Sequence, residues 1–154
     1  MGNIQYFPAA KNCGAECEAV LRTLPEWFGC EDSLAEYVSE IDNMDTYTAR
    51  ECGRTVGFFT ISEHFETSAE LHVLGIEREY HRHGIGSHLL KNVEDALRSK
   101  GVKFLQVKTL SPKAGNADYA LTMKFYLKHG FMALEDFDDL WGEDTPCRQL
   151  IKVL

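Results

Sequence analysis

The sequence has no run of apolar residues approaching the length of a membrane span, and its first residues lack the basic-then-apolar pattern of a secretory signal. We therefore expect a cytoplasmic protein with no membrane partner. It also has no C-x-x-C pair. Its five cysteines are an odd number at scattered positions: Cys13, Cys17, Cys30, Cys52 and Cys147. We expect reduced thiols that mostly fill the core and no metal site, with zinc held by Cys13, Cys17 and a histidine as the alternative.

Positive charge is scarce in this chain. It has 16 Lys and Arg against 24 Asp and Glu, which gives a formal net charge of -8. That balance argues against a nucleic-acid partner and is compatible with a cationic substrate attracted by a negative field. With 154 residues and 44% hydrophobic content, we expect a single domain over residues 1–154 with a real core. A homodimer is left open.

Two common nucleotide-binding motifs are missing. No G-x-x-x-x-G-K-[ST] occurs, which excludes a P-loop, and no G-x-G-x-x-G is followed by an acidic residue about 20 positions on. What is present is Gly84 and Gly86 at the start of an amphipathic pattern, after the apolar stretch 70–76. Two glycines there let backbone N–H groups surround an anion, which the helix dipole also favours. Basic residues gather nearby: Arg78, His81, Arg82, His83, His88 and Lys91.

Hydrophobic periodicity and turn residues predict alternating strands and helices, and hence an α/β fold. Ser33 with Glu36 is expected to cap the second helix, and Asp118 the last one. The expected strands are 4–7, 46–51, 54–62, 70–76, 104–110, 131–137 and 147–154. The expected helices are 13–24, 34–41, 84–100 and 118–129.

Two segments in a fixed order resemble signatures of the GNAT N-acetyltransferase superfamily. The run from His81 to Gly86 is similar to the [Q/R]-x-x-G-x-[G/A] motif that binds acetyl-CoA, with His81 in the Gln/Arg place. The run from Phe125 to Phe131 is similar to the second signature, x-Y-x-K-x-G-F. The resemblance covers roughly residues 55–154. It implies that acetyl-CoA is the co-substrate and that the residues of the first motif bind it: His81, Arg82, His83, Gly84, Ile85, Gly86 and Ser87.

The resemblance also implies a mixed, mostly antiparallel central sheet flanked by helices, whose middle strands 70–76 and 104–110 splay apart. The pantetheine arm of the cofactor lies in that split. Backbone groups of Val73, Leu74 and Ile76 would pair with it. Tyr119 stands where the family usually has an asparagine that binds the pantetheine, and Asn116 is an alternative for that contact.

Acetylation of an amine needs a base, because a primary amine with a pKa near ~10 is protonated at neutral pH. Ala69-Glu70-Leu71 resembles the family stretch that carries a catalytic glutamate, so Glu70 is the first choice for the base. His72 lies on the same strand face and is the reserve. Tyr126 is similar to the family tyrosine near the thioester sulfur, which makes it the expected general acid. No cysteine lies on strand 70–76 or in the glycine loop, which favours direct attack in a ternary complex.

The acetyl acceptor is poorly marked. Glu26, Trp27 and Phe28 are expected to form one wall of its pocket, and a stretch with Asp136 and Trp141 the other, because carboxylates and aromatic rings suit a cation. Polyamines, aminoglycosides, small amines, protein N-termini and lysines stay open as acceptors. Two other interpretations also remain. One is a non-catalytic CoA-binding sensor or interaction protein, and the other is a structural domain with a fortuitous glycine loop.

Overall fold

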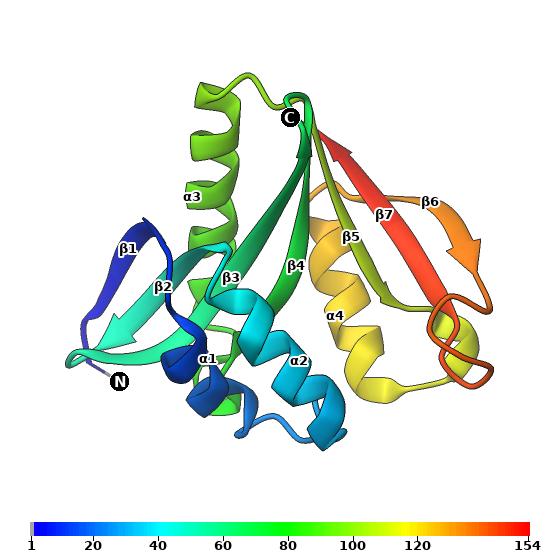
Figure 1. Ribbon diagram of the computed structural model, residues 1–154, viewed down its shortest axis with the longest axis horizontal. Helices are drawn as coiled ribbons and strands as arrows, with labels where there is room; N and C mark the ends of the chain where they lie inside the picture. Colours follow the sequence, from blue (N-terminus) through cyan, green and yellow to red (C-terminus); the bar gives the residue numbers. More distant parts are fainter. Residues whose placement is uncertain (1) are drawn as a thin grey trace.

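The computed structural model describes residues 2–154, in which seven strands form one sheet and four α-helices cover it (Figure 1). The strands are β1 (Ile4–Ala10), β2 (Asp45–Glu51), β3 (Arg54–Phe65), β4 (Ser68–Ile76), β5 (Phe104–Leu110), β6 (Met132–Phe137) and β7 (Cys147–Val153). The helices are α1 (Gly14–Leu21), α2 (Glu31–Ile41), α3 (Ile85–Ser99) and α4 (Ala117–Lys128), with short 3₁₀ turns η1 (Arg78–Tyr80) and η2 (Pro112–Ala114).

The strand order is β1-β2-β3-β4-β5-β7-β6, and every neighbouring pair is antiparallel except β4 and β5. Helix α3 connects that parallel pair, as a parallel connection requires. The expected α/β fold with a mostly antiparallel central sheet is therefore confirmed. Among residues 2–154, no helix is both long and apolar enough to cross a membrane.

The two sheet faces carry separate hydrophobic clusters. On one face, α3 packs four side chains against the sheet, none of them more than 2% exposed: Ile85, Leu89, Val93 and Leu97. That spacing of three and four residues is the apolar stripe of an amphipathic helix. On the other face, α1 and α2 cover Phe58 and neighbouring side chains of β3 and β4, and leave β5 to β7 uncovered (Figure 1).

Two helix starts differ from expectation. Cys30 is the N-cap of α2, so Ser33 lies inside the helix and forms no capping box. Asn116 caps α4, because its side-chain oxygen accepts hydrogen bonds from the backbone N–H groups of Asp118 (2.9 Å) and Tyr119 (3.1 Å). Asn is as good a cap as Asp, and here its geometry selects the earlier residue.

Candidate active site

Strands β4 and β5 separate halfway along the sheet. They pair in register from Ser68 opposite Phe104 to Leu71 opposite Val107, and no further. Beyond that point the two strands diverge, and α4 lies behind the gap (Figure 1). The predicted splay of the middle strands is therefore present, and it opens toward the ends of both strands that lead into α3 and α4.

A β-bulge on β4 marks the point of separation. The register with β3 shifts between Leu71 opposite Ile61 and Leu74 opposite Phe59, so that His72 and Val73 together face the single residue Thr60. The Thr60 hydroxyl accepts from the Val73 N–H at 2.8 Å and donates to the Val73 carbonyl at 2.7 Å. A bulge bends its strand and re-aims side chains, and it often lies next to an active site.

The bulge decides which backbone groups of β4 are free. Val73 and Glu77 bond toward β3, through Thr60 and Val56. Since the bonding direction alternates along a strand, Leu74 and Ile76 direct their N–H and C=O groups toward the gap. Val73 differs from expectation, because both of its backbone groups are already bonded to Thr60. The Ile76 carbonyl is also occupied, because His81 Nε2 lies 2.6 Å from it. The open edge of β4 therefore consists of both backbone groups of Leu74 and the N–H of Ile76.

The loop before α3 has the shape of an anion site. Arg82 (φ 63°) and Gly84 (φ 80°) both adopt left-handed conformations, which form a concave row of N–H groups when they alternate with right-handed residues. A Cβ at Gly84 would meet nothing within 4 Å, so the space in front of the loop is open. Gly86 has a different role, since a Cβ there would lie 3.3 Å from the Phe125 ring on α4.

Most of the expected basic cluster is engaged elsewhere. Arg78 pairs with Glu26 (3.3 Å) and Asp118 (3.6 Å), and Lys91 pairs with Asp95 (2.6 Å). His88 stacks on Tyr6, and His81 bonds through Nε2 to the Ile76 carbonyl at 2.6 Å. Of the basic side chains near the loop, Arg82 pairs with no carboxylate of residues 2–154, and both it and His83 are exposed.

Ser87 connects the loop to the end of α4. Its hydroxyl lies 2.8 Å from Nε2 of His129, whose Nδ1 lies 2.8 Å from the Phe125 carbonyl. The second contact fits an N–H donor at Nδ1, which makes Nε2 the acceptor of the Ser87 proton. Ile85 is buried under the loop, so its side chain serves packing and only its backbone is available to an anion.

The segment between α1 and α2 reaches across to α4. The Trp27 indole donates to the Thr122 hydroxyl at 3.2 Å, and the Tyr119 hydroxyl donates to the Trp27 carbonyl at 3.2 Å. The Arg78 guanidinium lies 5.0 Å from the centre of the Trp27 ring. Burial raises the pKa of Tyr119 to about 12, so its phenol stays a hydrogen-bond donor.

Tyr126 lies one helical turn beyond Met123 and is 3% exposed. Its ring packs against Phe131, with centroids 5.5 Å apart. Burial raises the pKa of its phenol well above the usual value. Among residues 2–154, no hydrogen bond holds the hydroxyl, so it is a protonated donor free for a ligand.

Glu70 is buried at the point where β4 and β5 part. Its side chain is 8% exposed, and both oxygens are occupied: Oε1 lies 2.7 Å from His64 Nε2 and Oε2 lies 3.0 Å from Lys108 Nζ. Lys108 lies on β5 one residue beyond the last paired position, and Glu70 lies on β4 opposite Gln106, so this ion pair joins the two strands at the end of their paired stretch.

His72 lies on the bulge, two residues further along the same face. Its Nε2 bonds to Glu40 Oε2 of α2, and its ring meets Tyr37 edge-on at 6.1 Å. The His72 side chain is 29% exposed, against 8% for Glu70. The bulge therefore presents a carboxylate–imidazole pair to solvent beside the start of the gap.

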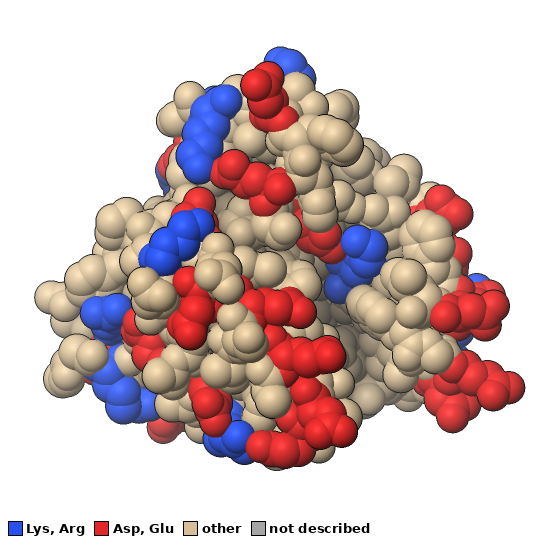
Figure 2. Space-filling model, in the orientation of Figure 1, with Lys and Arg blue, Asp and Glu red and all other residues tan. Residues whose placement is uncertain are grey.

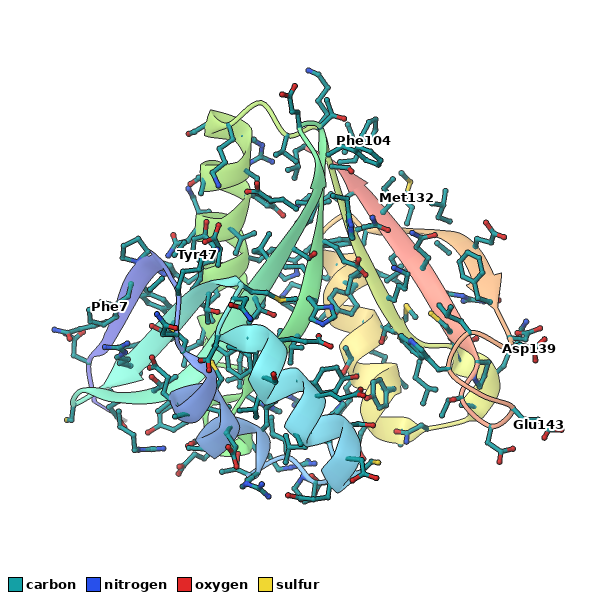
Figure 3. The ribbon with its side chains drawn as sticks, viewed as in Figure 1. Phe7, Tyr47, Phe104, Met132, Asp139 and Glu143 are labelled. Carbon is teal, nitrogen blue, oxygen red and sulfur yellow. The ribbon has the colours of Figure 1, made fainter. Side chains whose placement is uncertain are left out.

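The face around these residues is acidic. Figure 2 shows Asp and Glu side chains over α2 and, at the right, over the loop between β6 and β7, with a hollow between the two groups. Asp139 and Glu143 point outward from that loop (Figure 3). An open cavity of about 410 Å³ next to Glu40 is also lined by Asp45 and Glu63.

The expected acceptor walls are only partly brought together. Glu26 and Trp27 are engaged with Arg78, and Phe28 meets Tyr37 edge-on at 6.0 Å. Trp141 is 47% exposed in the loop between β6 and β7. Asp136 pairs with Arg148 at 2.7 Å, which is the main cause that lowers the pKa of its carboxyl to about 2.

Sequence reasoning missed four residues that surround the candidate catalytic groups: Glu40, Thr60, His64 and Lys108. Three of them lie on strands whose polar faces resemble ordinary solvent-facing positions, and Glu40 lies on an amphipathic helix. The alternation of Glu70 and His72 indicates their shared face, but no sequence pattern shows which partners cross to it.

The model of the Acetyltransferase (GNAT) family matches residues 17–131, which begins earlier than the motifs alone indicate. No curated protein sequence matches the chain.

Solved structures share the fold over nearly the whole chain. A putative GNAT acetyltransferase from Desulfovibrio desulfuricans superposes with a TM-score of 0.85 at 15% identity, covering 98% of this chain and 99% of that one. PaiA N-acetyltransferase from Thermoplasma acidophilum, in complex with coenzyme A, gives 0.76 at 18% identity, covering 99% of each. An aminoglycoside 6'-acetyltransferase type Ii gives 0.75 at 26% identity, covering 98% and 96%. With three quarters of its length matched by the family model, the chain belongs to the GNAT acetyltransferase family.

Proposed function

We propose that the protein is an acetyl-CoA-dependent N-acetyltransferase that transfers an acetyl group to a primary amine of a small molecule or peptide. The observation that carries this proposal is the open edge of β4. It runs from the loop at Arg82–Gly84, which is shaped for an anion, to the bulge at His72. An extended, hydrogen-bonding ligand with a phosphate group at one end fits that arrangement.

The chain's own groups fit coenzyme A along this path. The N–H groups of the loop and of the first turn of α3 would hold the pyrophosphate, with Arg82 as the available charge. Both backbone groups of Leu74 and the N–H of Ile76 would pair with the pantetheine as a neighbouring strand does. Tyr119 donates to the Trp27 carbonyl, and Asn116 uses its oxygen to cap α4, so only its amide N–H₂ is available to the arm.

The reaction requires three contributions from the protein: a base, positioning of the reactants and a general acid. A base on β4, either Glu70 or His72, removes a proton from the ammonium group so that the nitrogen can attack the thioester carbon. The rigid strand edge holds the two reactants at attacking distance. The Tyr126 phenol, which burial keeps protonated, donates to the departing sulfur.

Direct attack in a ternary complex fits the cysteines better than an acetyl-enzyme does. Cys147 is the thiol near Glu70 and Lys108, and it is fully buried. Burial raises the pKa of that thiol, which disfavours the nucleophilic thiolate. Initial rates at varied concentrations of both substrates should give intersecting lines, and parallel lines would indicate an acetyl-enzyme.

The acidic surroundings favour a cationic acceptor. Carboxylates over α2 lie beside the hollow in Figure 2, and those over the loop between β6 and β7 lie further to the right, while one Lys or Arg side chain lies at the upper rim. The net charge of -8 extends a negative field beyond this face. The name of the neighbour at 26% identity, an aminoglycoside 6'-acetyltransferase, agrees with a cationic amine as acceptor.

A second candidate is a CoA-binding sensor without turnover. It is favoured by two departures from the family pattern that have structural consequences. His81 bonds to the Ile76 carbonyl, and the Tyr119 phenol bonds to the Trp27 carbonyl. Both residues therefore form internal contacts at places where the family uses a cofactor ligand.

The test is a screen of acceptors that follows free thiol released from acetyl-CoA. The panel contains a polyamine, an aminoglycoside, a simple alkylamine and peptides with a free N-terminus or lysine. We expect acceptor-dependent thiol release with at least one cationic amine. Binding of CoA without thiol release from any acceptor would favour the sensor, and failure to bind CoA would contradict both.

A further inference from the structure

We infer that His72 is the base that deprotonates the acceptor amine, and that Glu40 of α2 is its positioning residue. This inference rests on the proposed N-acetyltransferase function and decides between its two candidate bases. Its starting point is the bulge on β4, which places His72 two residues before Leu74, where the open edge of the strand begins.

The geometry of the pair suits a base. Glu40 Oε2 holds Nε2 of His72, and Tyr37 bounds the ring edge-on at 6.1 Å. Within residues 2–154, Nδ1 has no hydrogen-bond partner. A carboxylate at one ring nitrogen fixes the tautomer in which the other nitrogen carries a lone pair, and it stabilises the imidazolium that forms. Nδ1 is then the acceptor for the amine proton.

Glu70 is less suited to the same task. One of its oxygens is 3.0 Å from the Lys108 ammonium and the other is 2.7 Å from His64, and only 8% of the side chain is exposed. A cationic acceptor approaching Glu70 would also meet the charge of Lys108. This ion pair instead joins β4 to β5 where the two strands separate, so we assign Glu70 mainly the role of holding the two strands together at that point.

The proton balance is complete with these groups. His72 Nδ1 takes one proton from the ammonium and later releases it to water. The neutral nitrogen then forms a bond to the thioester carbon while the carbon–sulfur bond breaks. The sulfur leaves as a thiol with a proton from Tyr126, and the second proton lost by the nitrogen restores the phenol. The net products are the amide, the free thiol and one proton.

The test compares four variants with the wild-type enzyme on an amine found in the acceptor screen. They are His72→Gln, Glu40→Gln, the double variant and Glu36→Gln. Glu36 is an exposed carboxylate one turn earlier on α2, so Glu36→Gln removes the same charge without touching His72. The readouts are kcat, the KM for acetyl-CoA and the melting temperature.

We expect His72→Gln to lower kcat by about 10²–10⁴-fold, the usual contribution of a positioned base. Glu40→Gln should lower kcat by roughly tenfold or more and Glu36→Gln should not. The double variant should be no worse than His72→Gln alone, because Glu40 acts only through the imidazole. The KM for acetyl-CoA should stay unchanged throughout.

Three results would overturn the inference while leaving the proposed function intact: normal kcat in His72→Gln, independent losses that multiply in the double variant, or an equal loss in Glu36→Gln. A fifth variant, Glu70→Gln, distinguishes the two candidate bases. If Glu70 is the base, that variant loses kcat and His72→Gln does not. If Glu70 instead serves to hold β4 and β5 together, Glu70→Gln lowers the melting temperature while kcat changes little. Absence of thiol release by the wild type contradicts the proposed function itself.

Discussion

Tyr126 is the residue at which a chemical role and a packing role meet. Its ring belongs to the core between α4 and β5, while its hydroxyl has no partner among the described residues. Tyr126→Phe keeps the ring and removes only the donor. We expect kcat to fall while the Kd for CoA and the melting temperature stay nearly unchanged, because the donor matters as the sulfur leaves. A loss of stability and of CoA binding at normal residual kcat would show that Tyr126 is a core residue with a polar tip.

Single residues were predicted unevenly from the sequence. Glu70 and Tyr126 were identified by their places in motifs, and His72 by its alternation with Glu70. The structure puts Glu70 and His72 beside the point where β4 and β5 separate, and Tyr126 in the hydrophobic core. The sequence could not show that both oxygens of Glu70 are occupied, because His64 and Lys108 come from other strands. Likewise, the partner of His72 lies 32 positions away on α2.

Among the elements, the bulge on β4 is the feature on which the site depends most. The Thr60 hydroxyl satisfies both backbone groups of Val73, which the bulge leaves without a ladder partner. Thr60→Val keeps the shape but removes that hydroxyl, and buried unpaired groups cost about 1–3 kcal/mol each. We expect a clearly lower melting temperature and a lower kcat.

Thr60→Ser is the matched control for the bulge, since it keeps the hydroxyl and loses only a methyl group. It should retain most of the kcat of the wild type. If Thr60→Val behaves like Thr60→Ser in stability and kcat, the hydroxyl does not hold the bulge and the backbone argument fails.

The loop before α3 allows a similarly matched pair. Gly84 (φ 80°) and Gly53 (φ 79°) have the same conformation, and a Cβ at either would meet nothing within 4 Å. Gly84→Asp puts a side chain and a negative charge where the pyrophosphate is expected, so CoA affinity should fall by ~100-fold or more, which is about 2.7 kcal/mol or more. Gly53→Asp carries the same backbone strain in the hairpin between β2 and β3 and should leave CoA affinity unchanged.

Isothermal titration calorimetry measures the Kd for CoA of the two variants directly. Equal affinities in the two folded variants would remove the loop from the cofactor site. Adding salt should weaken CoA binding to the wild type, because screening acts on the exposed Arg82 and the phosphate groups.

The elements themselves were largely predictable. Strand β5 spans the residues expected for it, and α3 follows its apolar stripe within a residue at each end. The bulge on β4 was not predictable, because one inserted residue cannot be recognised in a pattern of alternating polarity unless the partner strand is known. The caps of α2 and α4 were also misplaced, since several neighbouring polar residues compete for each cap and backbone geometry chooses among them.

At the scale of the whole molecule, burial of phenols sets a limit on alkaline stability. The pKa values of Tyr37, Tyr119 and Tyr126 are all raised by burial above the ordinary value of about 10. A raised pKa means that the unfolded chain releases the proton first, so this stabilisation is complete below about pH 10 and is lost as the pH rises further. The melting temperature should therefore fall steadily above about pH 10.

Tyr126→Phe removes one of these phenols and should make that fall shallower. A melting temperature that does not change between about pH 10 and pH 12 would mean that the buried phenols contribute no pH-dependent stability.

We propose that this chain moves an acetyl group from coenzyme A to the nitrogen of a cationic amine. The most direct measurement is mass spectrometry of an aminoglycoside or polyamine incubated with the protein and acetyl-CoA deuterated in the acetyl group. We predict a product heavier by one deuterated acetyl group, formed only with the protein present and bonded at an amine. If thiol is never released and the amine is recovered unlabelled while CoA binds, the protein is a CoA-binding member of its family without this activity.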